Sequence, residues 1–327
     1  MGVIASAPAK VILFGEHFVV YGEPAIVLAI DKRVYAKVEL RDDKRLYLHS
    51  VNLNIAGYFE NGIFKIEQGD AKEAKLKFEP LKLTVEKVLE IHGESAGLDV
   101  EVNSTVPVAA GLGSSAAVAA AVTAAVGALL NVKLSKETVF RISYEAEKIV
   151  HGTPSGVDPA ISTFGGSLLF QMDTGFKPLD VKADVPLVIG YTGVERSTRA
   201  QVAKVRDLKS KYPRVVEPMM RVAREIVLRA IDALKEGDLE TLGDLMNINH
   251  ALLYGLGVSD ESLEWLIRAA RKAGALGAKL TGAGGGGCMI ALAENGRLEE
   301  VFEAIQRAGG MPFIARKTDE GVKIERA

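Results

Sequence analysis

The stretch that decides the fold is VPVAAGLGSSAAVAAAV, residues 106–122. Gly111, Gly113, Ser114 and Ser115 stand between a strand-like segment and a run of strong helix formers. Glycine lets an anion approach the backbone closely, and the free N–H groups at the start of a helix attract phosphate. The pattern therefore predicts a phosphate-binding loop or, alternatively, a glycine turn and serine cap ahead of a buried helix.

Two common nucleotide-binding motifs do not fit this stretch. No lysine follows Gly113, so it is not a Walker A loop, and the dinucleotide pattern GxGxxG is absent. Helix and strand patterns are mixed in both halves of the chain, without the regular alternation of a doubly wound parallel sheet. These features predict an α+β fold.

The length and local composition predict two domains. A chain of 327 residues commonly divides in two. Residues 174–186 are rich in Pro, Gly and Asp, which favours a connection. We expect an N-terminal domain at residues 1–178 and a C-terminal domain at residues 179–327.

The charge and cysteine content narrow the class of protein. A net charge of −2 argues against a general nucleic-acid binder, which usually has a basic face. One cysteine, Cys288, cannot form an internal disulfide, and the five histidines show no zinc-site spacing. No signal peptide or apolar run of membrane-spanning length is visible. We expect a cytoplasmic protein with no membrane partner.

Hydrophobic periodicity gives the expected elements. In the first half these are strands at 10–15, 25–30, 33–40, 45–51, 98–108 and 165–172, and helices at 79–93, 114–130 and 135–152, with a turn-rich loop at 153–163. In the second half they are strands at 186–193 and within 277–293, helices at 218–235, 238–254, 260–273 and 297–309, and strands to the end.

Two charged residues stand in settings where a charge needs an explanation. Lys10 falls on the apolar face of a strand, where its ammonium is costly unless it is matched or the strand lies at an exposed edge. Asp158 lies in the turn-rich segment TPSGVDPAIST and is either functional or bonded to its own backbone.

Three further groups of residues are candidates. Glu145 and Glu147 share one helix, and the sequence does not say which points inward. The five glycines of the segment KLTGAGGGGC, residues 279–288, predict either a backbone that closely approaches another group or a glycine hairpin loop. Arg196 and Arg199 follow a strand and could meet an anionic substrate group or lie on the surface.

Three motifs occur in an order that resembles the GHMP kinase superfamily, the small-molecule kinases of galactose, homoserine, mevalonate and phosphomevalonate. They are PAKVILFGEHFVVYGEPAI at 8–26, PVAAGLGSSAA at 107–117 and KLTGAGGGGC at 279–288. Within the superfamily, the segments KVILFGEH, HGTPSGVDPAIST and ERSTRA resemble the mevalonate kinases. The resemblance runs from about residue 5 to residue 290.

The resemblance implies a fold and an activity. The fold would be the two-domain GHMP kinase fold, with a left-handed βαβ unit in the N-terminal ATP-binding and catalytic domain and a ferredoxin-like C-terminal domain. The activity would be ATP- and Mg²⁺-dependent phosphorylation of the primary hydroxyl of (R)-mevalonate to 5-phosphomevalonate, on the mevalonate route to isoprenoids. Many members are dimers, so we expect a homodimer.

Residue roles carried over from the resemblance are as follows. Asp158 would accept the hydroxyl proton, Lys10 would pair with Asp158, and Ser115 and Glu145 would hold magnesium. The substrate pocket would contain Glu16, His17, Ser155, Arg196 and Thr198. ATP would contact Pro107, Val108, Ala109, Ala110, Gly111, Leu112, Gly113, Ser114, Ser115, Ala116 and Ala117, with Thr281, Gly284 and Gly285 from the second glycine motif.

Two alternative functions stay open from the sequence. The chain could be a phosphomevalonate kinase or another GHMP kinase, although no extra Lys or Arg cluster for a phosphorylated substrate is evident. It could also be a ligand sensor that binds ATP without turnover, which the joint presence of Lys10, Ser115, Glu145 and Asp158 opposes.

Overall fold

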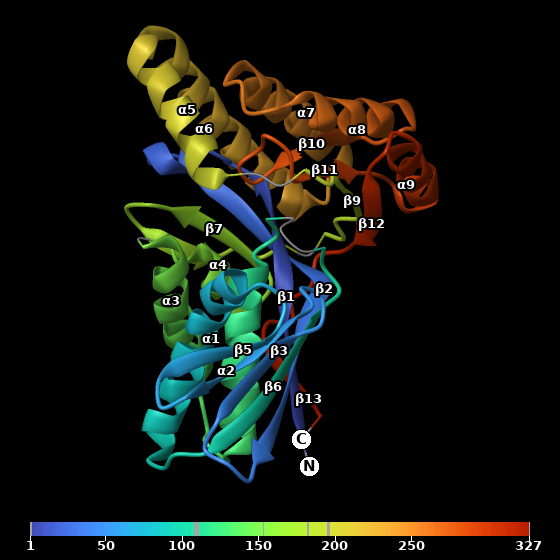
Figure 1. Ribbon diagram of the computed structural model, residues 1–327. Helices are drawn as coiled ribbons and strands as arrows, with labels where there is room; N and C mark the ends of the chain where they lie inside the picture. The colour runs from blue at the N-terminus through green and yellow to red at the C-terminus, as the bar shows by residue number, and fades with distance from the viewer. Residues whose placement is uncertain (1, 108–110, 153, 182, 195–196, 327) are drawn as a thin grey trace.

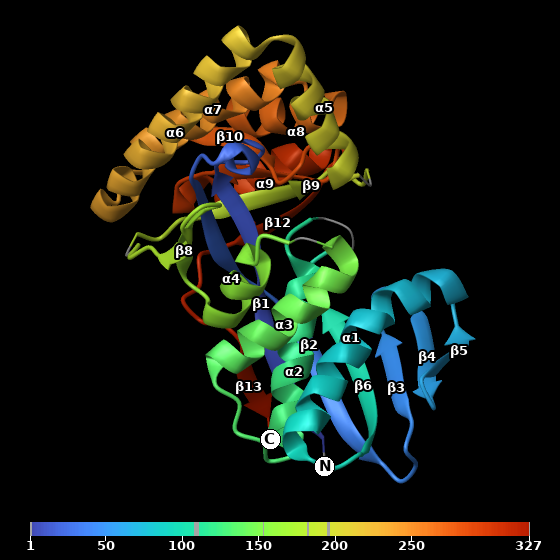
Figure 2. The same ribbon diagram turned by 90° about the vertical axis from the view of Figure 1, so that its left-hand side faces the viewer.

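The chain forms two β-sheets with helices packed against each (Figures 1 and 2). The computed structural model describes residues 2–107, 111–152, 154–181, 183–194 and 197–326. The first sheet follows the order β13-β1-β2-β6-β3-β4-β5, with β7 and β8 attached beside β2. Its strands are β1 (Val3–Phe14), β2 (Ala25–Arg41), β3 (Leu46–Ser50), β4 (Ile55–Glu60), β5 (Ile63–Gln68), β6 (Gly97–Ser104), β7 (Ser167–Gln171), β8 (Gly175–Pro178) and β13 (Lys323–Arg326).

Helices α1 (Ala71–His92), α2 (Ser114–Leu129) and α3 (Lys136–His151) pack with this sheet around one hydrophobic core. The predicted N-cap of α3 is confirmed, since Ser135 accepts a hydrogen bond from the amide of Thr138. The alanines of α2 are mostly buried, and their small side chains let this helix lie close to β1 and β2.

One pair of neighbouring strands in the first sheet is parallel. Strand β3 pairs with β6 in parallel, and the chain passes between them through β4, β5 and α1. A parallel pair requires such a crossover, and here the crossover contains a helix. This pair is the βαβ element of the sheet, and its left-handed crossover stays a prediction.

The second sheet has the ferredoxin-like arrangement that was expected. Strands β9 (Leu187–Tyr191), β10 (Gly277–Thr281), β11 (Cys288–Leu292) and β12 (Met311–Ala315) lie in the order β10-β11-β9-β12 and pair antiparallel. Helices separate β9 from β10 and β11 from β12, which gives the βαββαβ sequence of that fold. The helices are α5 (Thr198–Lys211), α6 (Pro213–Glu236), α7 (Leu239–Gly255), α8 (Glu261–Lys272) and α9 (Leu298–Arg307).

Strands β1 and β2 join the two halves of the molecule. Their upper ends reach the second half in Figure 1, and Val11 and Phe14 share a core with Ile189 and Ile290. The predicted domain boundary at residue 178 falls between β8 and β9, where the chain leaves the first sheet. The last strand, β13, returns to pair with β1 and brings the two termini together.

Several elements differ from the sequence prediction. Residues 25–41 form one strand instead of two, because the polar segment around Lys32 is accommodated by a shift in the β1–β2 register. Strands β4 and β5 and helix α5 were not predicted. Helix α6 begins at Pro213 rather than Pro218, since proline suits the first position of a helix.

Candidate active site

Lys10 and Asp158 form an ion pair in the interior of the first half. The Nζ atom of Lys10 lies 3.2 Å from Oδ1 of Asp158, and their side chains are 7% and 26% exposed. Strand β13 pairs with β1, the strand of Lys10, only at residues 4–6, but Lys10 itself is only 6% exposed, so its burial excludes the reading of Lys10 as a surface lysine. The charge of Lys10 is matched by a carboxylate, as a buried ammonium requires.

Asp158 begins a helix rather than lying in a loop. Residues 153–163 were predicted as turns, but α4 (Val157–Phe164) starts within them, with Gly156 at its N-cap in a left-handed conformation of φ 79°. Pro159 falls in the first turn, where its missing N–H costs nothing. Asp158 therefore stands where the helix dipole favours a negative charge.

The first glycine motif ends directly against this ion pair. A methyl group placed on Gly113 would lie 2.8 Å from Cγ of Lys10 and 3.6 Å from Oδ2 of Asp158. The amide of Lys10 also donates to the carbonyl of Leu112, at 2.9 Å. The loop, the lysine and the aspartate thus form one compact group.

Ser114 and Ser115 occupy the first two positions of α2, and Gly113 rather than a serine is the N-cap. The amides of the first turn have no partners within the helix, so they are available to an anion. Ser115 is exposed and Ser114 partly so. Val108, Ala109 and Ala110 of the predicted phosphate loop lie outside the described residues.

The acidic residue of α3 that faces the site is Glu147, which corrects the choice of Glu145. Glu147 is buried, and one of its carboxylate oxygens has no hydrogen-bond partner among the described residues. Burial and the nearby charge of Asp158 raise the pKa of Glu147 to about 8, against the effect of Lys10. The side chain of Glu145 is 45% exposed and pairs with Lys148 at 2.9 Å.

Helix geometry explains this correction and could have prevented the error. Residues two apart on a helix point in nearly opposite directions, so Glu145 and Glu147 cannot both face the site. Val139, Ser143 and Glu147 are spaced by four and share the buried face of α3. That spacing is the sequence signal that singles out Glu147.

Glu16 and His17 follow β1 and contact the second half of the chain. Glu16 is fully buried and forms an ion pair with Lys279, a residue that the sequence reasoning did not consider. His17 is buried, adopts a positive φ of 61°, and its Nε2 lies 2.8 Å from the carbonyl of Ala283. These contacts attach the end of β1 to the second glycine motif.

The glycines of the second motif pack closely against other segments of the same chain. A methyl group on Gly284 would lie 2.1 Å from the carbonyl oxygen of Val258, and one on Gly285 would lie 2.1 Å from Nε2 of Gln201. Thr281 bridges to β1, because its hydroxyl donates to the carbonyl of Ile12 at 2.9 Å and accepts from the amide of Ile12 at 3.1 Å. The motif is thus a close-packed turn between β10 and β11, attached to the strand that carries Lys10.

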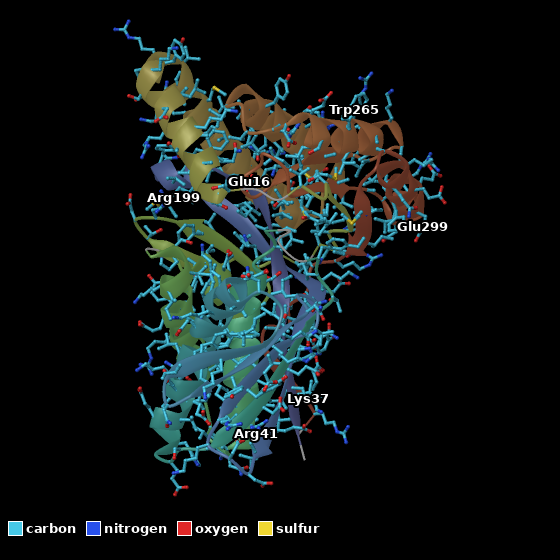
Figure 3. The ribbon with its side chains drawn as sticks, viewed as in Figure 1. Glu16, Lys37, Arg41, Arg199, Trp265 and Glu299 are labelled. Carbon is cyan, nitrogen blue, oxygen red and sulfur yellow. The ribbon has the colours of Figure 1, made fainter. Side chains whose placement is uncertain are left out.

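Two of the remaining predicted pocket residues, Ser155 and Thr198, lie at helix starts. Ser155 is exposed, and its hydroxyl accepts a hydrogen bond from the amide of Val157 at 3.3 Å. Thr198 is exposed at the first position of α5. Arg196 lies outside the described residues, and Arg199, the alternative, is exposed on α5 (Figure 3).

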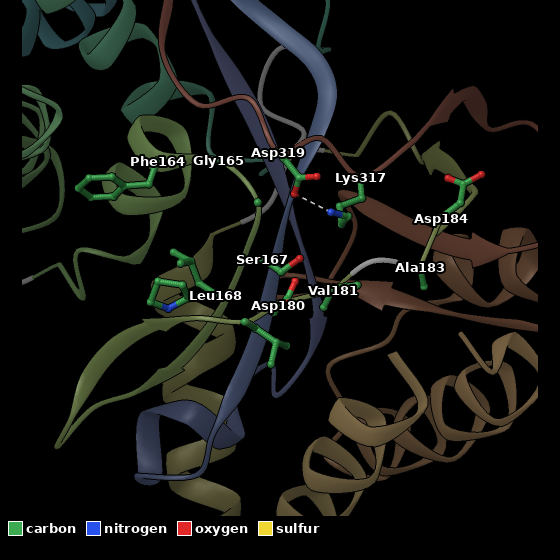
Figure 4. Close-up of a pocket in the computed structure, with 13 residues that line it drawn as sticks. Phe164, Gly165, Ser167, Leu168, Asp180, Val181, Ala183, Asp184, Lys317 and Asp319 are labelled. Atoms are coloured by element: carbon green, nitrogen blue, oxygen red, sulfur yellow. Dashed lines mark hydrogen bonds and ion pairs between the residues drawn. The ribbon is translucent and has the colours of Figure 1, made fainter. Parts of the chain in front are cut away.

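A separate cavity of about 630 Å³ lies elsewhere, around the connection that leaves β8 (Figure 4). Its wall includes Phe164, Leu168 and the pair of Lys317 and Asp319, whose charged atoms are 2.6 Å apart. None of the predicted site residues lines it. It opens beyond the C-terminal end of α4, whereas Asp158 stands at the N-terminal end.

The oxygen atoms of Ser115 and Glu147 could bind a magnesium ion that takes its remaining ligands from phosphate and water. No group of three His, Cys, Asp or Glu in the described part of the chain could hold a metal by itself. Magnesium usually takes only one or two carboxylates and completes its shell with phosphates and water. The unpartnered oxygen of Glu147 and the hydroxyl of Ser115 are ligands of that kind.

Family models match both halves of the chain. The model of the GHMP kinases N-terminal domain matches residues 80–166, which contain α2, α3 and Asp158. The model of the GHMP kinases C-terminal domain matches residues 230–310, which contain the second glycine motif. The chain belongs to the GHMP kinases.

Full-length relatives narrow this assignment to the mevalonate kinases. The chain is 46% identical to the mevalonate kinase of Pyrococcus horikoshii, with 99% of this chain and 98% of that protein covered. It is 45% identical to the mevalonate kinase of Pyrococcus furiosus, with 99% of each covered. Among solved structures, the L. major mevalonate kinase in complex with R-mevalonate has a TM-score of 0.83 and 29% identity, covering 97% of this chain and 96% of that one.

These comparisons confirm the predicted superfamily, its two-domain α+β fold and the resemblance to the mevalonate kinases. As a GHMP kinase the chain uses ATP and acts on a small molecule. Among the residues that the structure describes, no helix is both long and apolar enough to span a bilayer.

Proposed function

We propose that this chain transfers the γ-phosphoryl group of ATP to the primary hydroxyl of (R)-mevalonate, giving 5-phosphomevalonate and ADP. The observation that carries the proposal is the Lys10–Asp158 ion pair at the start of α2, in a chain 46% identical to a mevalonate kinase. Phosphoryl transfer depends on positioning and on neutralising charge, and this arrangement offers both.

Asp158 is the proposed proton acceptor and Lys10 its partner. The Asp158 carboxylate lies 3.2 Å from Nζ of Lys10 and is placed to accept a proton from the substrate hydroxyl. The Lys10 ammonium then stabilises the negative charge that develops on the attacking oxygen. The substrate hydroxyl would lie between this pair and the γ-phosphate.

The phosphates of ATP are proposed to lie over the N-terminus of α2. The free amides of the first helical turn and the glycine backbone of residues 111–113 offer hydrogen bonds and close approach. Pro107, Leu112, Ala116 and Ala117 belong to this segment, and the resemblance adds Val108, Ala109 and Ala110 to the proposed ATP contacts. Thr281, Gly284 and Gly285 belong to the turn that supports it.

Magnesium is proposed to bind Ser115 and Glu147 together with the phosphates. The metal would neutralise charge on the phosphate oxygens. Glu147 must lose its proton to serve as a ligand, and its pKa of about 8 makes that loss depend on pH near neutrality. The charge of Lys10 acts toward the ionised form, and a bound magnesium ion would favour that form further.

The substrate pocket is proposed to include His17, Ser155, Arg196 and Thr198. Arg196 would pair with the carboxylate of mevalonate, since arginine matches a planar carboxylate with two parallel hydrogen bonds. Glu16 is fully buried against Lys279, and we therefore remove it from the proposed substrate contacts.

A panel of alcohols tests the proposed substrate. Mevalonate, phosphomevalonate, galactose and homoserine are each incubated with Mg²⁺-ATP, and ADP release is measured in a coupled assay. We expect turnover with mevalonate at the highest kcat/KM. Turnover of phosphomevalonate without turnover of mevalonate would contradict the proposal, and ATP binding without turnover of any alcohol would indicate a sensor.

We also propose that the chain forms a homodimer. Sedimentation equilibrium at micromolar concentration tests this, because a monomer and a dimer differ twofold in mass. A single species at the mass of one chain would refute it.

A further inference from the structure

Helix α4, which carries Asp158, lies beside α3 (Figures 1 and 2). Two aromatic side chains of α3, Phe140 and Tyr144, are four residues apart and stack with their ring centroids 6.1 Å apart. The Phe140 ring also packs against Phe164, the last residue of α4, with the centroids 5.9 Å apart. An aromatic contact with α3 therefore holds the C-terminal end of α4.

Tyr144 contacts the chain at the opposite end of α4. A methyl group placed on Gly156, the N-cap of α4, would lie 3.2 Å from Cε2 and 3.4 Å from Cδ2 of Tyr144, so the ring lies directly against the glycine backbone. The Tyr144 hydroxyl also donates to the carbonyl of Pro154 at 3.3 Å. The side chain of Tyr144 thus contacts the chain on both sides of Ser155, just before α4 begins.

This contact lies next to the proposed reacting pair. The carbonyl of Gly156 accepts the first hydrogen bond of α4, from the amide of Ala160 at 3.1 Å, and Asp158 lies within that turn. A shift of Gly156 would therefore move the Asp158 carboxylate. Tyr144 and Glu147 are three residues apart on α3, which makes them neighbours on the helix surface. Helix α3 thus carries both the proposed magnesium ligand and the ring that contacts the start of α4.

We propose that Tyr144 is a positioning residue: its ring fixes Gly156, and through Gly156 it fixes the carboxylate of Asp158 relative to Lys10 and Glu147. This inference rests on the proposed function, in which Asp158 accepts the substrate proton and Glu147 binds magnesium. Tyr144 acts through the backbone of Gly156 and takes no part in the proton transfer.

Removal of the ring would leave a space beside Gly156, whose backbone changes conformation more readily than that of any other residue. The start of α4 would then shift toward that space, and Asp158 would move with it, away from Lys10. A displacement of about 1 Å at a reacting group lowers kcat by roughly 10- to 100-fold. The ATP phosphates are proposed to lie over α2, so the KM for ATP should change little.

The test compares Tyr144→Leu with Tyr144→Phe. Tyr144→Leu removes the ring, and we expect kcat per folded molecule to fall roughly 10- to 100-fold with little change in the KM for ATP. Tyr144→Phe keeps the ring and should keep most of the wild-type kcat.

The matched control is Tyr58→Leu. Tyr58 is half-buried like Tyr144, and each ring has a cation near it, Arg45 at 4.8 Å from the Tyr58 centroid and Lys148 at 4.7 Å from that of Tyr144. Tyr58 lies on β4, which β2, β6 and β3 separate from β1, the strand of Lys10. This variant should therefore leave kcat unchanged.

A crystal structure of Tyr144→Leu without substrate gives a readout that does not depend on activity. We expect Gly156 displaced toward the vacated space and the Asp158 carboxylate no longer in contact with Nζ of Lys10. An unchanged contact between Lys10 and Asp158, a Tyr144→Phe variant as slow as Tyr144→Leu, or an equal loss of kcat in Tyr58→Leu overturns the inference. If Tyr144→Leu does not fold, Tyr144→Met takes its place in both measurements. Failure of the wild type to phosphorylate mevalonate would refute the proposed function, and the crystal structure would still decide the inference.

Discussion

The two glycine-rich turns look alike in sequence and differ in what surrounds them. The first, at residues 111–113, ends at the N-terminus of α2 beside Lys10 and Asp158. The second, at residues 282–287, packs against the backbone of Val258 and the side chain of Gln201. Glycine in the first turn leaves room beside Lys10 and Asp158, the proposed reacting pair, whereas glycine in the second makes room for other segments of the protein's own chain.

The two motifs therefore differ in what their glycines contribute, the first to activity and the second to stability. A side chain added in the first turn meets the flexible stem of Lys10, which can move. A side chain added in the second meets a carbonyl oxygen, which cannot move without displacing the backbone. The same substitution should therefore affect activity in one turn and stability in the other.

The largest expected effect is the loss of stability in Gly284→Ala. A methyl group there would lie 2.1 Å from the carbonyl of Val258, at a φ of +71°. Overpacking and the left-handed conformation together should lower the free energy of unfolding by about 3 kcal/mol. Urea denaturation measures this change.

Gly237→Ala is the matched control for that prediction. Its φ is +76°, but nothing lies within 4 Å of the added methyl group. It should lose only about 1 kcal/mol, the cost of the backbone conformation. Equal losses in the two variants would show that the second turn is not closely packed.

Gly113→Ala should reverse the pattern by reducing activity more than stability. The added methyl group would lie 2.8 Å from Cγ of Lys10 and push the lysine from its position beside Asp158. We expect kcat to fall roughly 10- to 100-fold, with a smaller loss of stability than in Gly284→Ala. A kcat equal to that of wild type would contradict the assignment of the first turn to activity.

A smaller effect is expected on magnesium at the first turn. Glu147→Gln should raise the Mg²⁺ concentration needed for half-maximal activity about tenfold, because a neutral amide is a weaker ligand than a carboxylate. Glu145→Gln, on the opposite face of α3, is the control and should change nothing. A response to Glu145→Gln alone would restore the original assignment.

The pKa of Glu147 also predicts how stability changes with pH in the absence of metal. Folding raises this pKa from 4.5 to about 8, so the fold favours the protonated form. The contribution of protonated Glu147 to the free energy of unfolding is complete below about pH 4.5 and is lost as the pH rises toward about 8. Urea denaturation of the metal-free protein at several pH values should show a decline that Glu147→Gln reduces. An identical pH dependence in both proteins would contradict the shifted pKa.

Local patterns and the resemblance to the GHMP kinases together predicted much of this fold. The strand, glycine turn and helix around residue 111 are present, and the C-terminal sheet has its expected ferredoxin-like order. The contact between Lys10 and Asp158 was also expected and is present. Periodicity and turn residues predict the first of these features, whereas the ferredoxin-like sheet and the Lys10–Asp158 contact were implied by the resemblance that the three motifs carry.

Other features depend on contacts between distant segments and were missed. The partner of Glu16 is Lys279, 263 positions away, and no local pattern links them. Helix α4 was read as a loop because Gly156 and Pro159 break helices in their interior but suit a helix start. The choice between Glu145 and Glu147 required the buried face of α3, which the spacing of its apolar residues indicates.

The most direct test of the central claim is the activity of Asp158→Asn with mevalonate and Mg²⁺-ATP. The amide keeps the shape of the side chain and cannot accept the proton. We predict that kcat falls by roughly 10²- to 10⁴-fold, while calorimetry shows ATP binding close to that of wild type. A kcat near that of wild type would contradict the assignment of Asp158 and Lys10 as the reacting pair.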